Sequence, residues 1–248
     1  RDALWLCVCG AVVLSVSSLL FGSPAQQYLA GGSRRYYRSN EPIKECPDCQ
    51  IRYPSEDRNI WCTESTCLYT KKGFKMGPNQ DESVVIESPS SNHWFIAGLF
   101  DGHGNGGELV SQIAAATLPK RILALHRHET AANTVFQQAF LEIDDGPLVN
   151  MREGGSTAIV VLQTNSTIHM ASTGDSAAIL VQWFGIGEQG NGLSPYKVLM
   201  EAAKHKPADP IERARVESGG GFVHIPINPN ESSRVVYRIQ SANGKLMQ

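Results

Sequence analysis

The sequence predicts an α+β fold in which helices pack on antiparallel sheet. Short runs rich in valine, isoleucine and aromatic residues alternate with helical patterns in the order β-β-α-α-β-β-β-β-α, which is not regular βαβ alternation. The chain of 248 residues is 42% hydrophobic, so it can hold one large domain or two small ones. Its net charge of -2 offers no basic field for nucleic acid, and we expect no nucleic-acid partner.

The first segment, residues 1–25, is apolar. Residues 3–22 carry no charged side chain and would span about 30 Å as a helix, the thickness of a bilayer core. We predict a single-pass membrane anchor, with Arg34, Arg35 and Arg38 keeping the following domain on the cytoplasmic side. The alternative is a cleaved signal peptide that sends the domain into the secretory pathway.

The second segment, residues 26–70, is rich in glycine, serine, proline, arginine and tyrosine, and we predict a linker or insert. It contains two close cysteine pairs, Cys46 with Cys49 and Cys62 with Cys67. In the cytosol these four cysteines could bind zinc, and in an oxidising lumen they could form two disulfides. The Cys46-Pro-Asp-Cys49 pair alone could instead be redox-active, or all four cysteines could stay free thiols.

The third segment, residues 71–248, holds the predicted domain. Its β-type runs are bounded by glycine, asparagine and serine. They are Val84–Ile86, Trp94–Phe100, Thr157–Gln163, Thr167–Ser172, Ala177–Trp183 and Tyr196–Met200. Thr164-Asn165-Ser166 is a turn sequence that predicts a hairpin between the third run and the fourth.

Three helical patterns lie among these runs. Glu108–Leu125 has apolar residues near one side, and Pro119 predicts a kink or break within it. Thr130–Asp144 has apolar residues at helical spacing. The third helix is predicted from Asp209, its N-cap, to Gly219. Proline takes its first position, and a glutamate at position 212 completes a capping box.

The first candidate site is the glycine-rich run Phe100–Gly107, which follows an apolar strand and precedes a helix. Asp101 supplies a carboxylate, and Gly102 lets its backbone carbonyl approach a ligand. Both are hard oxygen donors of the kind that Mg²⁺ or Mn²⁺ prefers. His103 can act as an acid near neutral pH. Taken alone, this run could equally be a flexible turn.

Two further aspartates lie in turns beside predicted strands. Asp81 follows Asn79-Gln80, and Asp175 lies within Gly174-Asp175-Ser176. Each is an ordinary turn sequence by itself. Carboxylates that cluster repel one another, and proteins usually keep them together to bind a cation.

In this order, the motifs around Asp81, Asp101 and Asp175 resemble those of the metal-dependent (type-2C, PPM-type) serine/threonine protein phosphatases. The resemblance covers roughly residues 71–225. Its other segments are Gly155-Ser156-Thr157-Ala158, His205-Lys206-Pro207, Glu212–Arg213 and Gly219–Val223. It implies a β-sandwich of two antiparallel sheets flanked by helices, here preceded by an N-terminal apolar helix. It also implies a site for two or more Mg²⁺ or Mn²⁺ ions at one end of the sandwich.

The resemblance also implies roles for the candidate residues. Asp101 would bridge two metal ions, and the Gly102 carbonyl would bind one of them. Asp81 would lie in the metal site, mostly through ordered water, and Asp175 would hold a further, weaker ion. His103 would be the general acid in the hydrolysis of phosphoserine and phosphothreonine proteins by a metal-activated water.

Two of the chain's departures from the family pattern bear on the predicted site. The family usually has an arginine that grips phosphate before the first aspartate. Lys75 could replace it here as a point charge, next to Met76. The family also completes its site with two later aspartates, whereas the only aspartate after Asp175 is Asp209. We therefore expect a truncated domain with an incomplete sandwich. The alternative function is a catalytically impaired pseudophosphatase that acts as a binding or regulatory module.

Overall fold

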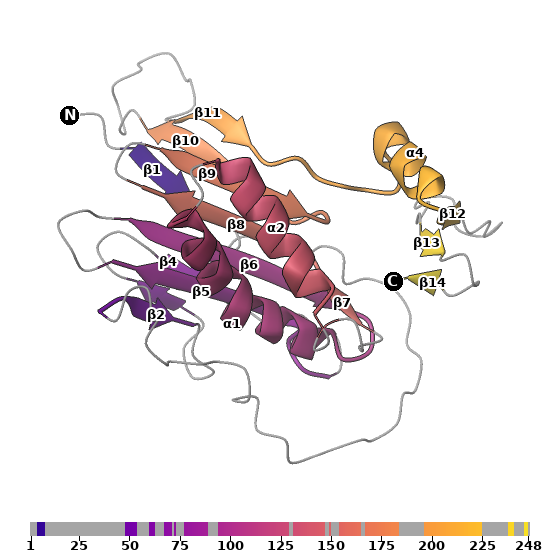
Figure 1. Cartoon of the computed structure of the whole chain (residues 1–248), viewed down its shortest axis with the longest axis horizontal. Helices are drawn as coiled ribbons and strands as arrows, with labels where there is room; N and C mark the ends of the chain where they lie inside the picture. The colour runs from indigo at the N-terminus through magenta and orange to yellow at the C-terminus, as the bar shows by residue number, and fades with distance from the viewer. Residues whose placement is uncertain are drawn as a thin grey trace.

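The architecture was obtained as a computed structural model (Figure 1). It describes residues 4–7, 48–53, 60–62, 67–70, 72, 77–88, 94–128, 131–146, 149, 154–164, 167–183, 196–224, 238–240 and 246–247.

An antiparallel sheet forms the centre of the fold. Its strand order is β2-β5-β6-β8-β9, and the short strand β7 pairs with the end of β6. The strands are β2 (Gln50–Arg52), β5 (Asp81–Glu87), β6 (Phe95–His103), β7 (Gly155–Ser156), β8 (Ala158–Gln163) and β9 (Ile168–Thr173). The predicted hairpin between the third and fourth β-type runs is confirmed, because β8 pairs directly with β9.

Two helices cover one face of this sheet (Figure 1). They are α1 (Gly107–His126) and α2 (Ala132–Asp144), close to the predicted bounds. The helix α1 runs unbroken through Pro119, which is buried within it. Of the predicted kink or break, the break is therefore wrong, and the kink stays a prediction. Phe100 and Val160 from the sheet pack with Ile122 and Val135 from the helices, and all four are fully buried. Burial of each such side chain contributes about 1.5–3 kcal/mol.

A smaller antiparallel sheet follows in the order β1-β10-β11. Its strands are β1 (Leu4–Cys7), β10 (Ile179–Trp183) and β11 (Tyr196–Glu201). Ala178 and Ala202, next to β10 and β11, pack against Ile159 and Val161 of β8 on the sheet face that the helices leave free. The fold is therefore a mixed one of antiparallel sheets and helices, as predicted.

The prediction of an N-terminal apolar helix is wrong for Leu4–Cys7, the part of this segment that the structure describes. Leu4–Cys7 form strand β1 and pair with Ile179–Gln182 of β10. Their backbone groups find partners across the strand pair instead of within a helical turn. No helix among the described residues is long and apolar enough to cross a bilayer. Residues 8–47 lie outside the described part, so the anchor and the signal peptide stay predictions.

The segment predicted as a linker contributes strands to the structure. Its residues Gln50–Arg52 form β2 at the edge of the central sheet, and a separate hairpin joins β3 (Ile60–Cys62) to β4 (Cys67–Tyr69). Cys49 and Cys67 are each disulfide-bonded, which excludes the zinc and free-thiol alternatives for these two residues.

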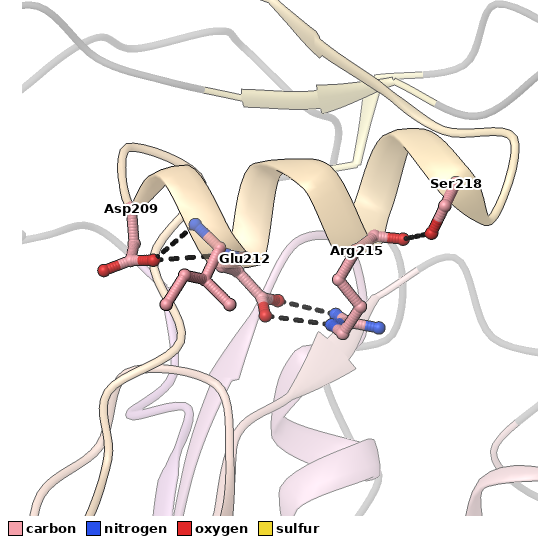
Figure 2. Close-up of polar contacts among 5 residues, drawn as sticks. Asp209, Glu212, Arg215 and Ser218 are labelled. Carbon is pink, nitrogen blue, oxygen red and sulfur yellow. Dashed lines mark hydrogen bonds and ion pairs between the residues drawn. The ribbon is translucent and has the colours of Figure 1, made fainter.

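The third predicted helix is confirmed as α4 (Pro210–Ser218), beside the small sheet of β12 (Phe222–His224), β13 (Arg238–Gln240) and β14 (Leu246–Met247) (Figure 1). The Asp209 side chain accepts hydrogen bonds from the backbone N–H groups of Ile211 and Glu212, as an N-cap does (Figure 2). The predicted capping box is wrong, because the Glu212 carboxylate binds Arg215, 2.9 Å from its Nε (Figure 2).

Candidate metal centre

Two of the predicted metal ligands lie opposite one another at one end of the central sheet. Asp81 opens β5, Asp101 lies near the end of β6, and the register of the two strands pairs them directly. Directly paired residues of antiparallel strands have Cβ atoms about 4.5–5.5 Å apart on the same face. Since Phe100 faces the helices, both aspartates project from the other face. Both are half-buried.

Gly102 follows in a space that excludes any side chain. A Cβ atom there would lie 2.4 Å from the Gly107 carbonyl oxygen and 2.5 Å from that of Gln80. The Gly102 N–H donates to the Gln80 carbonyl at 3.1 Å. The loop that follows Asp101 is thus held directly against the residue that precedes Asp81.

Gln80 fixes this loop, and its role was not predicted from the sequence. Its Nε2 donates to the Gly104 carbonyl at 2.8 Å and to the Glu108 carboxylate at 3.1 Å. Its carbonyl accepts a hydrogen bond from the Ser111 hydroxyl at 2.6 Å. One glutamine therefore joins the first acidic turn to the glycine-rich loop and to the start of α1.

Thr157 holds Asp101 from the other side and was likewise not predicted as a site residue. The Asp101 N–H donates to the Thr157 hydroxyl at 3.0 Å, and the Thr157 N–H donates to the Asp101 carbonyl at 2.9 Å. The only available signal was its place in the Gly155-Ser156-Thr157-Ala158 motif. Sequence spacing could not show that this motif lies beside Asp101.

Asp175 lies in the turn between β9 and β10 and is exposed. Its Oδ2 is 3.6 Å from the Lys206 ammonium. The His205 N–H donates to the Gly174 carbonyl at 2.9 Å, so the segment before α4 is fastened to this turn. The structure thus brings together two of the motifs that carried the family resemblance.

His103 is close enough to Asp101 and Asp175 for both charges to act on its imidazole. Burial lowers the pKa of its imidazole, while the negative charges of Asp101 and Asp175 act in the opposite direction. Part of the side chain remains exposed. Its ring lies over Gly155, where a Cβ atom would come within 2.7 Å of the His103 Cε1.

The oxygen atoms available at this end of the sheet are of the kind that a hard divalent cation prefers. Asp81 and Asp101 supply carboxylate oxygens, and Gly102 supplies a backbone carbonyl in the same loop. Within the ranges that the structure describes, no three histidine, cysteine, aspartate or glutamate side chains converge closely enough to hold a metal ion. Lys75 and Met76 lie outside the described residues.

Comparisons with known proteins show which family this sequence belongs to. The sequence model of the protein phosphatase 2C family matches residues 72–242. Probable protein phosphatase 2C 1 of Arabidopsis thaliana is 26% identical over 221 residues, covering 75% of this chain and 46% of the relative. Protein phosphatase 1L of Bos taurus is 26% identical over 176 residues, covering 65% of this chain and 44% of the relative.

A solved structure of a phosphatase from Toxoplasma gondii aligns with a TM-score of 0.37 and 16% identity, covering 67% of this chain and 63% of that chain. The chain spans about half the length of the curated relatives it matches. Because the family model matches more than half of the chain, the chain belongs to the protein phosphatase 2C family.

Proposed function

We propose that this chain is part of a metal-dependent phosphatase that hydrolyses phosphoserine and phosphothreonine in proteins. The observation that carries the proposal is the direct pairing of Asp81 with Asp101 at the end of the central sheet. Two opposed carboxylates repel one another unless a cation lies between them. Membership of the protein phosphatase 2C family supports phosphoproteins as the substrate class.

The Mg²⁺ or Mn²⁺ ions would be held by the carboxylates of Asp81, Asp101 and Asp175 and by the Gly102 carbonyl. When bound, such ions lower the pKa of water and neutralise charge on phosphoryl oxygens. His103 would donate an imidazole proton to the departing serine or threonine oxygen.

Lys75 would bind the phosphate through its single positive charge. Lys75→Ala should then raise KM for phosphopeptide more than it changes kcat.

The decisive experiment measures phosphate release from a phosphopeptide by the full-length protein with and without Mn²⁺. We expect Mn²⁺-dependent turnover that Asp101→Asn abolishes. Asp209→Asn is the matched control, because it removes the same charge from the N-cap of α4, where asparagine still caps a helix. A wild-type protein that binds Mn²⁺ without turnover would establish the pseudophosphatase instead. Turnover without any metal dependence would contradict the proposal.

We further propose that the domain works in an oxidising compartment, such as the lumen of the secretory pathway, and not on the cytoplasmic side of a membrane. The disulfides of Cys49 and Cys67 support this, because cytosolic reductants keep thiols reduced. Alkylation of intact cells should leave both cysteines unlabelled until a reductant is added. Immediate labelling of Cys49 and Cys67 would place the domain in the cytosol.

A further inference from the structure

We propose that Thr157 is a positioning residue that couples the strand carrying Asp101 to the turn carrying Asp175. The inference rests on the proposed metal-dependent function. It adds that Asp101 and Asp175 do not bind cations independently, because the buried Thr157 side chain contacts both the strand that carries Asp101 and the turn that carries Asp175.

The hydroxyl arm of Thr157 links the two acidic segments. Thr157 is 8% exposed and lies at the interruption between β7 and β8. Its Oγ1 accepts the Asp101 N–H at 3.0 Å and lies 2.6 Å from the Ser176 Oγ. A hydroxyl has one hydrogen and two lone pairs, so it can make both bonds at once, whichever oxygen donates in the contact with Ser176. Ser176 directly follows Asp175 in the turn.

The methyl arm of Thr157 packs under the other end of the same turn. Gly174 has a φ of +83°, and a Cβ atom there would lie 2.7 Å from the Thr157 Cγ2. Only glycine therefore fits both the backbone conformation and the contact. Because the side chain is branched at Cβ, its hydroxyl and methyl positions are fixed together. Thr157 thus contacts the residues on both sides of Asp175.

The carboxylate of Asp175 itself is exposed, and Lys206 at 3.6 Å is an exposed and therefore weak partner. Its position thus depends mainly on the backbone of the turn that Thr157 supports. The Asp101 backbone is bound to Thr157 through both its N–H and its carbonyl. A shift of either acidic segment on binding a cation would be transmitted through Thr157 to the other. Such coupling must act equally in both directions.

Two substitutions separate the arms of the side chain. Thr157→Val keeps the shape and removes the hydroxyl, whereas Thr157→Ser keeps the hydroxyl and removes the methyl. Thr164→Val is the matched control, because it removes an exposed hydroxyl in the β8–β9 hairpin. Mn²⁺ dissociation constants would be measured on the full-length proteins by electron paramagnetic resonance of free Mn²⁺, alongside the thermal midpoints of the metal-free proteins.

Thr157→Val removes both hydrogen bonds of the hydroxyl. We expect it to weaken Mn²⁺ binding about tenfold, a factor within the usual range of coupling between two sites. Thr157→Ser should restore most of the affinity, and Thr164→Val should bind as the wild type does. Adding Asp175→Asn to Thr157→Val should weaken binding by less than Asp175→Asn does in the wild-type background, because the coupling is already broken.

The outcomes separate the two proposals. A wild-type protein that binds no Mn²⁺ would overturn the proposed function. Wild-type binding with unchanged affinity in Thr157→Val, even with a lower thermal midpoint, would overturn the coupling alone. If Thr157→Val does not fold, Ser176→Ala replaces it, since it removes the hydrogen bond between Thr157 and the half-buried turn and keeps the one to Asp101. Unchanged affinity in that variant would equally overturn the coupling.

Discussion

At the scale of single residues, Gly155 sets the position of the proposed general acid. It pairs with His103 between β7 and β6, and its missing side chain leaves room for the imidazole. The His103 imidazole thus lies against the backbone of Gly155, where no side chain could move aside. A Cβ atom at this position would overlap the ring, at 2.7 Å from Cε1 and 2.9 Å from Nε2.

Gly155→Ala should therefore displace the imidazole and reduce kcat for phosphopeptide by about 10²-fold, the scale of a misplaced catalytic group. Hydrolysis of p-nitrophenyl phosphate should fall much less, because its leaving group needs no proton. Gly219→Ala serves as the control, since its φ is -82° and the nearest atom to an added Cβ is 3.5 Å away. Equal losses on both substrates would argue against the general-acid role.

The charge state of His103 gives a second prediction. In the metal-free protein its imidazole should titrate below the ordinary pKa of 6.5, because burial opposes the charged form. Asp101→Asn should lower this pKa further, since the carboxylate favours the imidazolium. Nuclear magnetic resonance of the histidine ring protons measures both.

The lowered pKa of His103 also makes the free energy of unfolding depend on pH. The unfolded chain binds the His103 proton more tightly than the folded chain does, so this group lowers the free energy of unfolding as pH falls below 6.5. His103→Gln should reduce that dependence. A titration midpoint above 6.5 in the metal-free protein would contradict the prediction, because it would show that the charges of Asp101 and Asp175 outweigh the effect of burial.

At the scale of elements, α1 and α2 are joined on their outer side by Arg121 and Glu142. The Arg121 Nη2 donates to Glu142 at 2.8 Å, and Gln138 donates to the same oxygen at 2.8 Å. The hydrogen bond from Arg121, supported by that from Gln138, lowers the pKa of Glu142 to about 2. The pair is exposed, so it aligns the two helices more than it stabilises the fold.

Because the folded pKa of Glu142 lies below its ordinary value of 4.5, its contribution to stability is present above pH 4.5. It should be lost as pH falls from 4.5 towards 2. Urea unfolding measures the free energy of unfolding of the wild type and of Glu142→Gln across this pH range. We expect the two values to converge at low pH. A difference between the two proteins that is independent of pH would show that the ion pair contributes nothing.

At the scale of the whole molecule, two disulfide-bonded cysteines lie in the N-terminal part of the fold. Cys49 precedes β2, which pairs with β5, and the residue packs against the main core. Cys67 begins β4, whose Leu68 packs with Val85 on the other face of the sheet. The strand that begins with Asp81 is thus flanked by disulfide-bonded segments.

Reduction should lower the free energy of unfolding by about 2–4 kcal/mol, mainly because the unfolded chain gains freedom. Chemical unfolding with and without dithiothreitol measures this. The variant Cys49→Ser/Cys67→Ser should show a much smaller effect of the reductant. An unchanged midpoint for the reduced wild-type protein would mean that these bonds do not support the fold.

Much of the fold was predictable from local pattern. The strand β8 and the helix α2 were located because apolar periodicity is a property of neighbouring residues. The bounds of β5 were predicted too short, since its first residues are polar and only pairing with β6 makes them a strand. The strand β1 was predicted as a helix, because an apolar run is compatible with either structure and pairing with the distant β10 makes it a strand.

The sequence by itself determined the mixed fold, the family motifs and the identity of the acidic residues Asp81, Asp101 and Asp175. These follow from residue type and order along the chain. Only the tertiary structure decided that Asp81 faces Asp101, that Gln80 holds the glycine-rich loop, and that Thr157 joins the two acidic segments. The physical reason is that strand register and side-chain hydrogen bonds join residues distant in sequence, and local periodicity carries no information about such partners.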